Sequence, residues 1–463
     1  MNYGDLILAP IFLGLLYLYF RRQRNKITDP LLQKYHRQGF WIKMIGCVAF
    51  FMYSVYIYPA DSIGLYQTEG NNIYHLILTN SRHFHWLLQK GKYFDESYLK
   101  NPYNTGYSKS EANFMVIRIV ALLSFLTAGR YAAISFLFAG IAFSGVWKLY
   151  LFFYEQNPKL HRQFAIAILY FPTFIFWSSG VLKDTLSIAS MGWITYGLYS
   201  VVYLRKKVIK YTLTTLFFAY LLATLKIYIL ISYTPFLLLY LFLKRLNVIR
   251  NGFVKLMLAP LVVIGLVIGF TLFLNSNENA LGRYAIDDLA SSIETLNGAY
   301  KSMDGNSTAD SNFDLGVQFD GTPEGLIRIA PVAVFTTFFR PFIWESHKMS
   351  QMIASAENLL LILFLFWVIL KAGPFSILRM ILTDPLITFC FLFSIVFAVF
   401  VGASTLNFGT LVRYKIPALP FFTISLFLMY DKAKERALRK KEARARAAES
   451  VAPGSLTASL QPG

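Results

Sequence analysis

The sequence is dominated by apolar runs long enough to cross a lipid bilayer, joined by short loops that carry basic residues. A bilayer core about 30 Å thick needs roughly 20 apolar residues per helix, and a bundle tolerates shorter ones. Only 15% of the residues are charged and 56% are hydrophobic, whereas about a quarter of the residues of a soluble protein are charged. The chain is therefore predicted to be an integral membrane protein.

The runs predict an all-α, polytopic transmembrane bundle of about eleven helices (11–13). Two further apolar segments, 113–128 and 326–342, each contain an Arg and are assigned to the outer interface or to re-entrant positions. Counting both segments as spans gives thirteen helices and reverses the predicted orientation of the chain between residues 113 and 342. The predicted spans are residues 4–20, 39–58, 131–153, 164–178, 185–204, 211–225, 227–243, 256–274, 358–371, 385–402 and 416–430.

Basic clusters set the predicted orientation, because Lys and Arg concentrate in cytoplasmic loops. RRQRNK (21–26), RKKVIK (205–210), KRLNVIR (244–250) and the C-terminal stretch are placed in the cytoplasm. The N-terminus is then outside. The apolar stretch 211–243 lies between two cytoplasmic clusters, so it must leave and return as a hairpin with Lys226 near its outer tip.

The predicted domain organisation has two parts. Residues 1–430 form the transmembrane domain, including two large outer loops at 59–112 and 275–325. The first loop contains a helix-compatible stretch, 71–89, that could lie along the membrane, and the second is rich in Gly, Ser, Asn and Asp. Residues 431–463 form a basic cytoplasmic tail whose end, beyond about residue 447, is expected to be disordered.

Several classes of function are disfavoured. The net charge of +19 is spread over loops and the tail without a nucleic-acid recognition motif, so no nucleic-acid partner is predicted. Both cysteines lie inside apolar runs. His75, His83 and His85 do not have the spacing of a zinc site, so no metal-ligating residues are assigned. No nucleotide-binding or serine-hydrolase motif is present, and no cofactor is predicted, although assistance by a divalent ion is left open.

Two acids are candidate catalytic residues. Asp61 directly follows the second predicted span in IYPADSIGLYQTEG, and Glu69 follows eight residues later. A carboxylate at the outer mouth of a helix can accept a proton from an acceptor hydroxyl while a lipid phosphate departs. The structural alternative is an acid near a helix end that contacts water.

The basic candidates share a predicted position on the outer face, where the topology signal disfavours Lys and Arg. Arg binds phosphate through two parallel hydrogen bonds and Lys adds a point charge. Snorkelling to lipid headgroups is the structural alternative. Asp184, Lys226 and Glu345 are placed around the phosphate-binding residues, with helix capping as the structural alternative for Asp184. The predicted phosphate-binding residues are Lys183, Arg340, Arg413 and Lys415.

Four features together resemble a known group of proteins: the first-loop acid, FWSSGVLKD, FRPFIWE and NFGTLVRYKIPALPF. In this layout, over much of residues 50–430, the chain resembles polytopic proteins of bacterial envelope polysaccharide loci and is similar to GT-C glycosyltransferases and O-antigen polymerase-like proteins. The resemblance implies that Asp61 is the base and Arg413 a phosphate-binding residue. The family often has two adjacent acids, whereas Ser62 follows Asp61 here, which leaves open whether Glu69 substitutes.

The leading expectation is a bacterial inner-membrane enzyme that transfers a sugar or glycan from a polyprenyl-phosphate-linked donor to a glycan or lipid acceptor at the outer face, in contact with membrane lipids. One alternative is a transporter or flippase for a lipid-linked glycan. That function would require charges near helix centres or broken helices, and the sequence shows few deep charges, with Lys148 as the main exception. The other alternative is a noncatalytic envelope scaffold.

Overall fold

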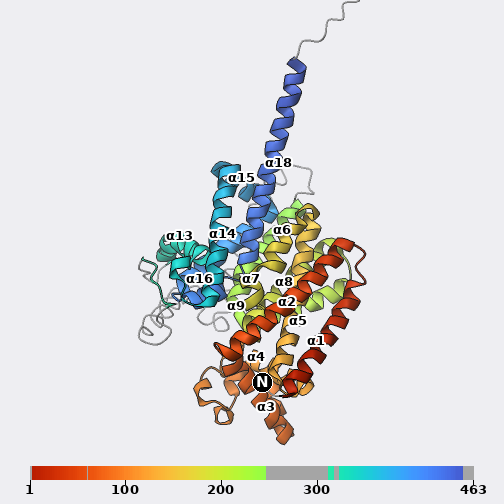
Figure 1. The fold of residues 1–463 in the computed structure, drawn as a ribbon, viewed down its shortest axis with the longest axis vertical. Helices are drawn as coiled ribbons and strands as arrows, with labels where there is room; N and C mark the ends of the chain where they lie inside the picture. The colour runs from red at the N-terminus through yellow and green to blue at the C-terminus, as the bar shows by residue number, and fades with distance from the viewer. Residues whose placement is uncertain (1–2, 60, 247–310, 317–322, 452–463) are drawn as a thin grey trace, which may run out of the picture.

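The computed structural model describes residues 3–59, 61–246, 311–316 and 323–451, and the described part is all-α with no β-sheet (Figure 1). An isolated bridge joins Asn312 to Asn407. The helices are α1 (Tyr3–Arg24), α2 (Pro30–Tyr56), α3 (Thr68–Thr79), α4 (Glu111–Thr127), α5 (Tyr131–Gln156), α6 (His161–Ala165), α7 (Pro172–Trp177), α8 (Lys183–Tyr199), α9 (Val208–Leu246), α13 (Pro323–Phe339), α14 (Met349–Ala372), α15 (Pro374–Thr383), α16 (Pro385–Ser404), α17 (Phe408–Tyr414) and α18 (Leu419–Val451).

Five described helices are long and apolar enough to cross a membrane, namely α2, α5, α9, α14 and α16. The pair α17–α18, bent by 63°, makes a sixth if it is counted as one span. This number is smaller than the predicted eleven because the structure divides or shortens several apolar runs. The run 164–178 is interrupted at Pro172, which begins α7 after the extended residue Phe171. The predicted span 256–274 lies outside the described residues.

Helix α9 is a hairpin, as the sequence predicted. Its backbone breaks at Lys226, where φ is −152° and ψ is 74°. Contacts with α8 and the turn after it show that the first half of α9 runs antiparallel to α8 and the second half parallel to it. The pairs are Tyr196 with Tyr211 and Trp193 with Phe218 for the first half, and Asp184 with Lys226, Thr195 with Tyr233 and Tyr203 with Leu241 for the second.

The basic clusters gather at one end of the bundle. Tyr154, near the end of α5, donates a hydrogen bond to Asp29 next to the 21–26 cluster. Lys244 contacts Gln156 at the last residue of α5, and Lys159 pairs with Asp431 of α18. Lys244 also lies over the ring of Tyr203, just before the 205–210 cluster. The prediction that the 21–26 and 205–210 clusters and the tail lie at the same end of the bundle is confirmed. We call this the basic end; Figure 1 shows α18 projecting there, opposite α3 and the N-terminus.

The two segments assigned to the outer interface are helices that do not qualify as long apolar spans. Helix α4 packs on α3, where Gly70 lies against Val120. Helix α13 packs on α16, where Thr337 donates a hydrogen bond to the carbonyl of Ala398 at 2.9 Å. In the first outer loop, the predicted helix over 71–89 is real but shorter, because α3 ends at Thr79 and a 3-10 turn follows.

The second outer loop, 275–325, lies almost entirely outside the described residues. The basic stretch of the tail is helical, since α18 continues without a break through it to Val451. Its last residues, 452–463, also lie outside the described part.

Helices α5 and α8 touch backbone to backbone at the centre of the bundle. A Cβ added to Gly192 would lie 1.9 Å from the carbonyl oxygen of Gly145, and one added to Gly145 would lie 2.2 Å from that of Ala189. Small residues at helix crossings in membrane proteins permit this close approach. The crossing fixes α8, which carries the central residue of the candidate site.

Candidate functional site

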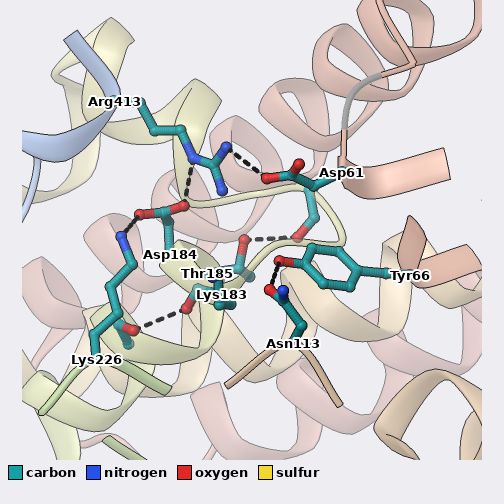
Figure 2. Close-up of polar contacts among 10 residues, drawn as sticks. Asp61, Tyr66, Asn113, Lys183, Asp184, Thr185, Lys226 and Arg413 are labelled. Carbon is teal, nitrogen blue, oxygen red and sulfur yellow. Dashed lines mark hydrogen bonds and ion pairs between the residues drawn. The ribbon is translucent and has the colours of Figure 1, made fainter. Parts of the chain in front are cut away.

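Three interruptions of the helical backbone meet at one place in the bundle. They are the buried loop 178–182 between α7 and α8, the break in α9 at Lys226, and the bend between α17 and α18. Irregular backbone at membrane depth is tolerated only where protein covers it or where it lines a cavity. The three interruptions bring together Asp184, Lys226 and Arg413 (Figure 2).

Asp184 is the common partner of the other two residues. Its side chain is 1% exposed and its carboxylate accepts from Arg413 Nε at 2.6 Å through Oδ2, while Oδ1 pairs with Lys226 Nζ. The capping role that the sequence allowed is not the one observed, because Leu182 is the N-cap of α8 and Asp184 contacts other helices. The sequence placed Asp184 at the margin of the site, whereas the structure places it at the centre.

Arg413 also reaches Asp61, so it bridges two carboxylates from distant parts of the chain. Its Nη1 donates to Asp61 Oδ2 at 3.1 Å. The Asp61 side chain is 49% exposed, and the Arg413 guanidinium lies 6.0 Å from the ring centre of Trp177. The structure thus unites the two residues expected to act as base and phosphate ligand, and it leaves Asp61 open to solvent.

Lys183 adds a positive charge that no carboxylate in the described part of the chain contacts. Within the described ranges, its ammonium makes no hydrogen bond or ion pair, yet it lies within electrostatic range of the other four charged groups. Three cations (Lys183, Lys226 and Arg413) therefore face two carboxylates (Asp61 and Asp184), an excess of one positive charge. An anionic ligand would balance it. We call these five residues the ion cluster.

Tyr66 closes the ion cluster on the side of the outer loop. It is fully buried, and its hydroxyl donates to Asn113 Oδ1 at 3.2 Å (Figure 2). Burial, followed in importance by the charge of Asp61, raises the pKa of the Tyr66 phenol well above its ordinary value. The phenol consequently stays neutral and acts as a hydrogen-bond donor.

Glu69 does not join the ion cluster. Its buried carboxylate accepts hydrogen bonds from the backbone N–H groups of Lys100 and Asn101, both at 3.0 Å, and from the Asn104 amide at 2.7 Å. These contacts tie the outer loop to α3. The geometry gives Glu69 a structural role, and a catalytic role has no contact with Asp61 to support it.

Replacing Glu69 with Gln should loosen this loop without affecting the ion cluster. Charge-assisted hydrogen bonds contribute roughly 1.5–3 kcal/mol each, and Gln cannot accept all three bonds with the same strength. Hydrogen exchange should accelerate over residues 100–104 and stay unchanged over α8. The matched variant Glu96→Gln, which alters a different carboxylate of the same loop, should leave residues 100 and 101 protected.

Arg340 lies apart from the ion cluster, contrary to the expected grouping of outer cations. Its Nε donates to Glu345 at 3.0 Å, and its guanidinium lies over the rings of Phe313 and Phe408. Phe408 begins α17 and Arg413 lies near its end. Glu345, placed by the sequence beside a phosphate site, neutralises Arg340 instead.

Lys415 is completely buried and contacts a different set of residues from those of the ion cluster. Its ammonium donates to Asn358 Oδ1 at 2.6 Å, and Glu357 is its charged neighbour.

Glu357 accepts from the N–H of Thr173 at 2.7 Å, and its other carboxylate oxygen is buried without a partner among the described residues. The sequence reasoning missed Glu357. A signal was present, because this acid lies directly before the predicted span 358–371.

Lys43 is a second residue that the sequence reasoning missed. It is buried within α2, and its ammonium donates to Ser178 Oγ at 2.5 Å, at the start of the loop that leads to Lys183.

No metal-binding group of three or more His, Cys, Asp or Glu occurs in the part of the chain that the structure describes. His83 stacks on Trp86, as part of an aromatic cluster in the outer loop.

The fold and these buried charges define the chain as a multi-pass helical membrane protein with five to six candidate spans. No protein family matches the chain, and neither a curated protein nor a solved structure does so. The resemblance to GT-C and O-antigen polymerase-like proteins therefore depends on the short motifs and their layout alone.

Proposed function

We propose that this chain is a GT-C-like membrane glycosyltransferase or polymerase-like enzyme that uses a polyprenyl-phosphate-linked sugar or glycan. The observation that carries the proposal is the ion cluster, with one excess positive charge beside a half-exposed carboxylate. A phosphate monoanion would neutralise it.

In the proposed reaction, a hydroxyl of the acceptor attacks the anomeric carbon of the donor sugar. The bond between that carbon and the phosphate oxygen breaks, and the phosphate leaves with the electron pair. Asp61 takes the hydroxyl proton as general base, and Arg413 and Lys183 stabilise the departing phosphate. Asp184 holds Arg413 and Lys226 in position.

The proposed setting is the bacterial inner membrane with the ion cluster at the outer face. Placing the basic end in the cytoplasm satisfies the positive-inside bias, and it puts the N-terminus outside and the C-terminus inside. The proposed bundle has about eleven crossings, in which each half of α9, the shorter helix α8 and the interrupted run 164–178 that ends in α7 each count as one.

A transporter or flippase for a lipid-linked glycan is the second candidate, because several charged side chains are buried inside the bundle. Lys43, Asp184, Lys226 and Lys415 are all buried, and the ion cluster lies at broken helices, as substrate sites of transporters do. A scaffold is the remaining alternative.

Asp61→Asn separates these functions. The purified chain in proteoliposomes would receive radiolabelled polyprenyl-phosphate-linked sugars, and both label transfer to acceptor and label movement across the bilayer would be measured. We expect transfer to fall at least about 100-fold, the lower range for loss of a general base, while donor binding persists. If the wild type moves the labelled lipid across the bilayer without transferring the sugar, and Arg413→Ala loses this movement, the chain is a transporter instead.

Binding is tested separately by native mass spectrometry with a polyprenyl monophosphate. Lys183→Met should weaken binding about tenfold, since a charge-assisted contact is worth at least about 1.5 kcal/mol. Lys210→Met, which removes an exposed charge at the basic end, is the matched control. Equal affinity of the wild type and Lys183→Met would contradict the proposal, and a chain without binding, transfer or transport would be a scaffold.

A further inference from the structure

Helix α15 connects two candidate spans at the basic end. It follows α14 after Gly373, whose φ of 77° allows the turn, and it precedes α16, whose N-cap is Asp384. Asp384 pairs with Lys432 of α18 at 2.6 Å, which fixes the location of this corner. Because both flanking helices are candidate spans, α15 must lie near the membrane surface at this end.

The side chains of α15 divide into three sectors. At about 100° per residue, the three sectors are centred roughly 120° apart. The first packs against the core, the second is apolar and exposed, and the third is polar. Their members are Ile377, Met380 and Ile381 for the core sector, Phe375, Leu378 and Leu382 for the exposed apolar sector, and Ser376, Arg379 and Thr383 for the polar sector.

The exposed apolar sector is too apolar to face water. Phe375 is 88% exposed and Leu382 is 73% exposed. An amphipathic helix of this kind lies in the interface with its apolar face in the acyl chains and its polar face among the headgroups. The core sector, which packs on the bundle, fixes the rotation of α15 about its axis.

Basic and aromatic groups surround the polar sector. Lys371 lies 4.6 Å over the ring of Trp367, which is itself half exposed, and Trp and Lys commonly anchor proteins at this depth. Arg436 of α18 contacts Ser376. No carboxylate pairs with Lys371 or Arg379 among the residues described, so their charge is available to lipid phosphates.

We propose that α15 is an interfacial helix that lies in the leaflet at the basic end, with Phe375, Leu378 and Leu382 in the acyl chains and Lys371 and Arg379 on the phosphates of anionic lipids. The proposal does not depend on the reaction at Asp61. It gives the chain a lipid-binding surface separate from the ion cluster, at the opposite end of the bundle.

Spin labels test the depth of α15. The two natural cysteines are buried, so single cysteines can be introduced at Phe375, Leu382 and, as the matched control, exposed Leu438 on the projecting part of α18. Labels at 375 and 382 in nanodiscs should favour collision with oxygen over an aqueous nickel chelate, and the label at 438 should favour nickel. Nickel accessibility at 375 and 382 equal to that at 438 would overturn the proposal. The unsubstituted chain controls for background labelling.

Lipid preference tests the charges. The protein would be purified from mixed phosphatidylglycerol and phosphatidylcholine, and the lipids that stay bound to it would be counted by native mass spectrometry. The amount of bound phosphatidylglycerol should fall at least about threefold in Lys371→Gln/Arg379→Gln. Lys440→Gln/Lys441→Gln, on the projecting helix, should retain as much as the wild type. Loss in this control pair but not in the α15 pair would refute the assignment.

Discussion

Asp184→Asn is expected to lower the free energy of unfolding by about 3–5 kcal/mol, the usual cost of removing one partner from a buried ion pair. The asparagine retains the volume but not the charge, so buried Lys226 would lose its carboxylate partner and Arg413 would keep only half-exposed Asp61. The measurement is the thermal midpoint of the purified chain in detergent, together with the fraction that elutes as a monodisperse species in size-exclusion chromatography.

Asp61→Asn is the matched control. It also removes a carboxylate that pairs with Arg413, but this carboxylate is half exposed. Exposed ion pairs contribute about 0–1 kcal/mol, so its thermal midpoint should stay close to that of the wild type. The variant Asp184→Leu/Lys226→Met/Arg413→Met should recover part of the loss, because uncharged replacements of a buried ionic group are often tolerated. Equal midpoints for Asp184→Asn and the wild type would disprove the central position of this carboxylate.

Gly192→Ala is expected to destabilise the bundle by about 3 kcal/mol, at the upper end of the usual cost of overpacking. The added Cβ would lie 1.9 Å from a backbone oxygen of α5. Backbone atoms cannot rotate away as a flexible side chain can, so α5 and α8 must separate. The loss should appear as a lower thermal midpoint and as faster hydrogen exchange in the second half of α8.

Gly14→Ala provides the control for this substitution, because a Cβ at that position in α1 has no neighbour within 4 Å. Alanine favours helix over glycine by up to about 1 kcal/mol, so this variant should be as stable as the wild type or more stable. A Gly192→Ala variant that behaves like Gly14→Ala would show that α5 and α8 are not in backbone contact.

The sequence predicted the helical class, the hairpin at Lys226 and the common side of the basic clusters, because these depend on apolar length and charge placement. It did not predict every helix break: residues 164–178 form one predicted span, yet Pro172 interrupts them. Pro417 marks the bend after Arg413, but the angle of 63° between α17 and α18 depends on tertiary contacts. The apolar runs therefore outnumber the long unbroken helices among the described residues.

For the site, residue type and predicted position indicated several residues of the ion cluster, but they did not indicate which residues pair with one another. Lys183 and Arg413 were singled out because cations at the predicted outer face needed a reason, and both belong to the ion cluster. Arg340 met the same criterion, yet Glu345 pairs with it. Sequence alone could not distinguish the two cases, because it does not show which carboxylates each arginine will pair with.

A single carboxylate, that of Asp184, balances cations from two different helices. Moving α9 away from α8 would leave buried Lys226 without its carboxylate, and moving α17 away would leave Arg413 with Asp61 as its remaining carboxylate partner, so either movement breaks a buried ion pair at a large cost. Rearrangements at this place must therefore be concerted, with the three helices displaced as one mechanical unit. A transferase would gain a rigid reaction centre from this coupling, and a transporter would be limited to rocking the whole assembly.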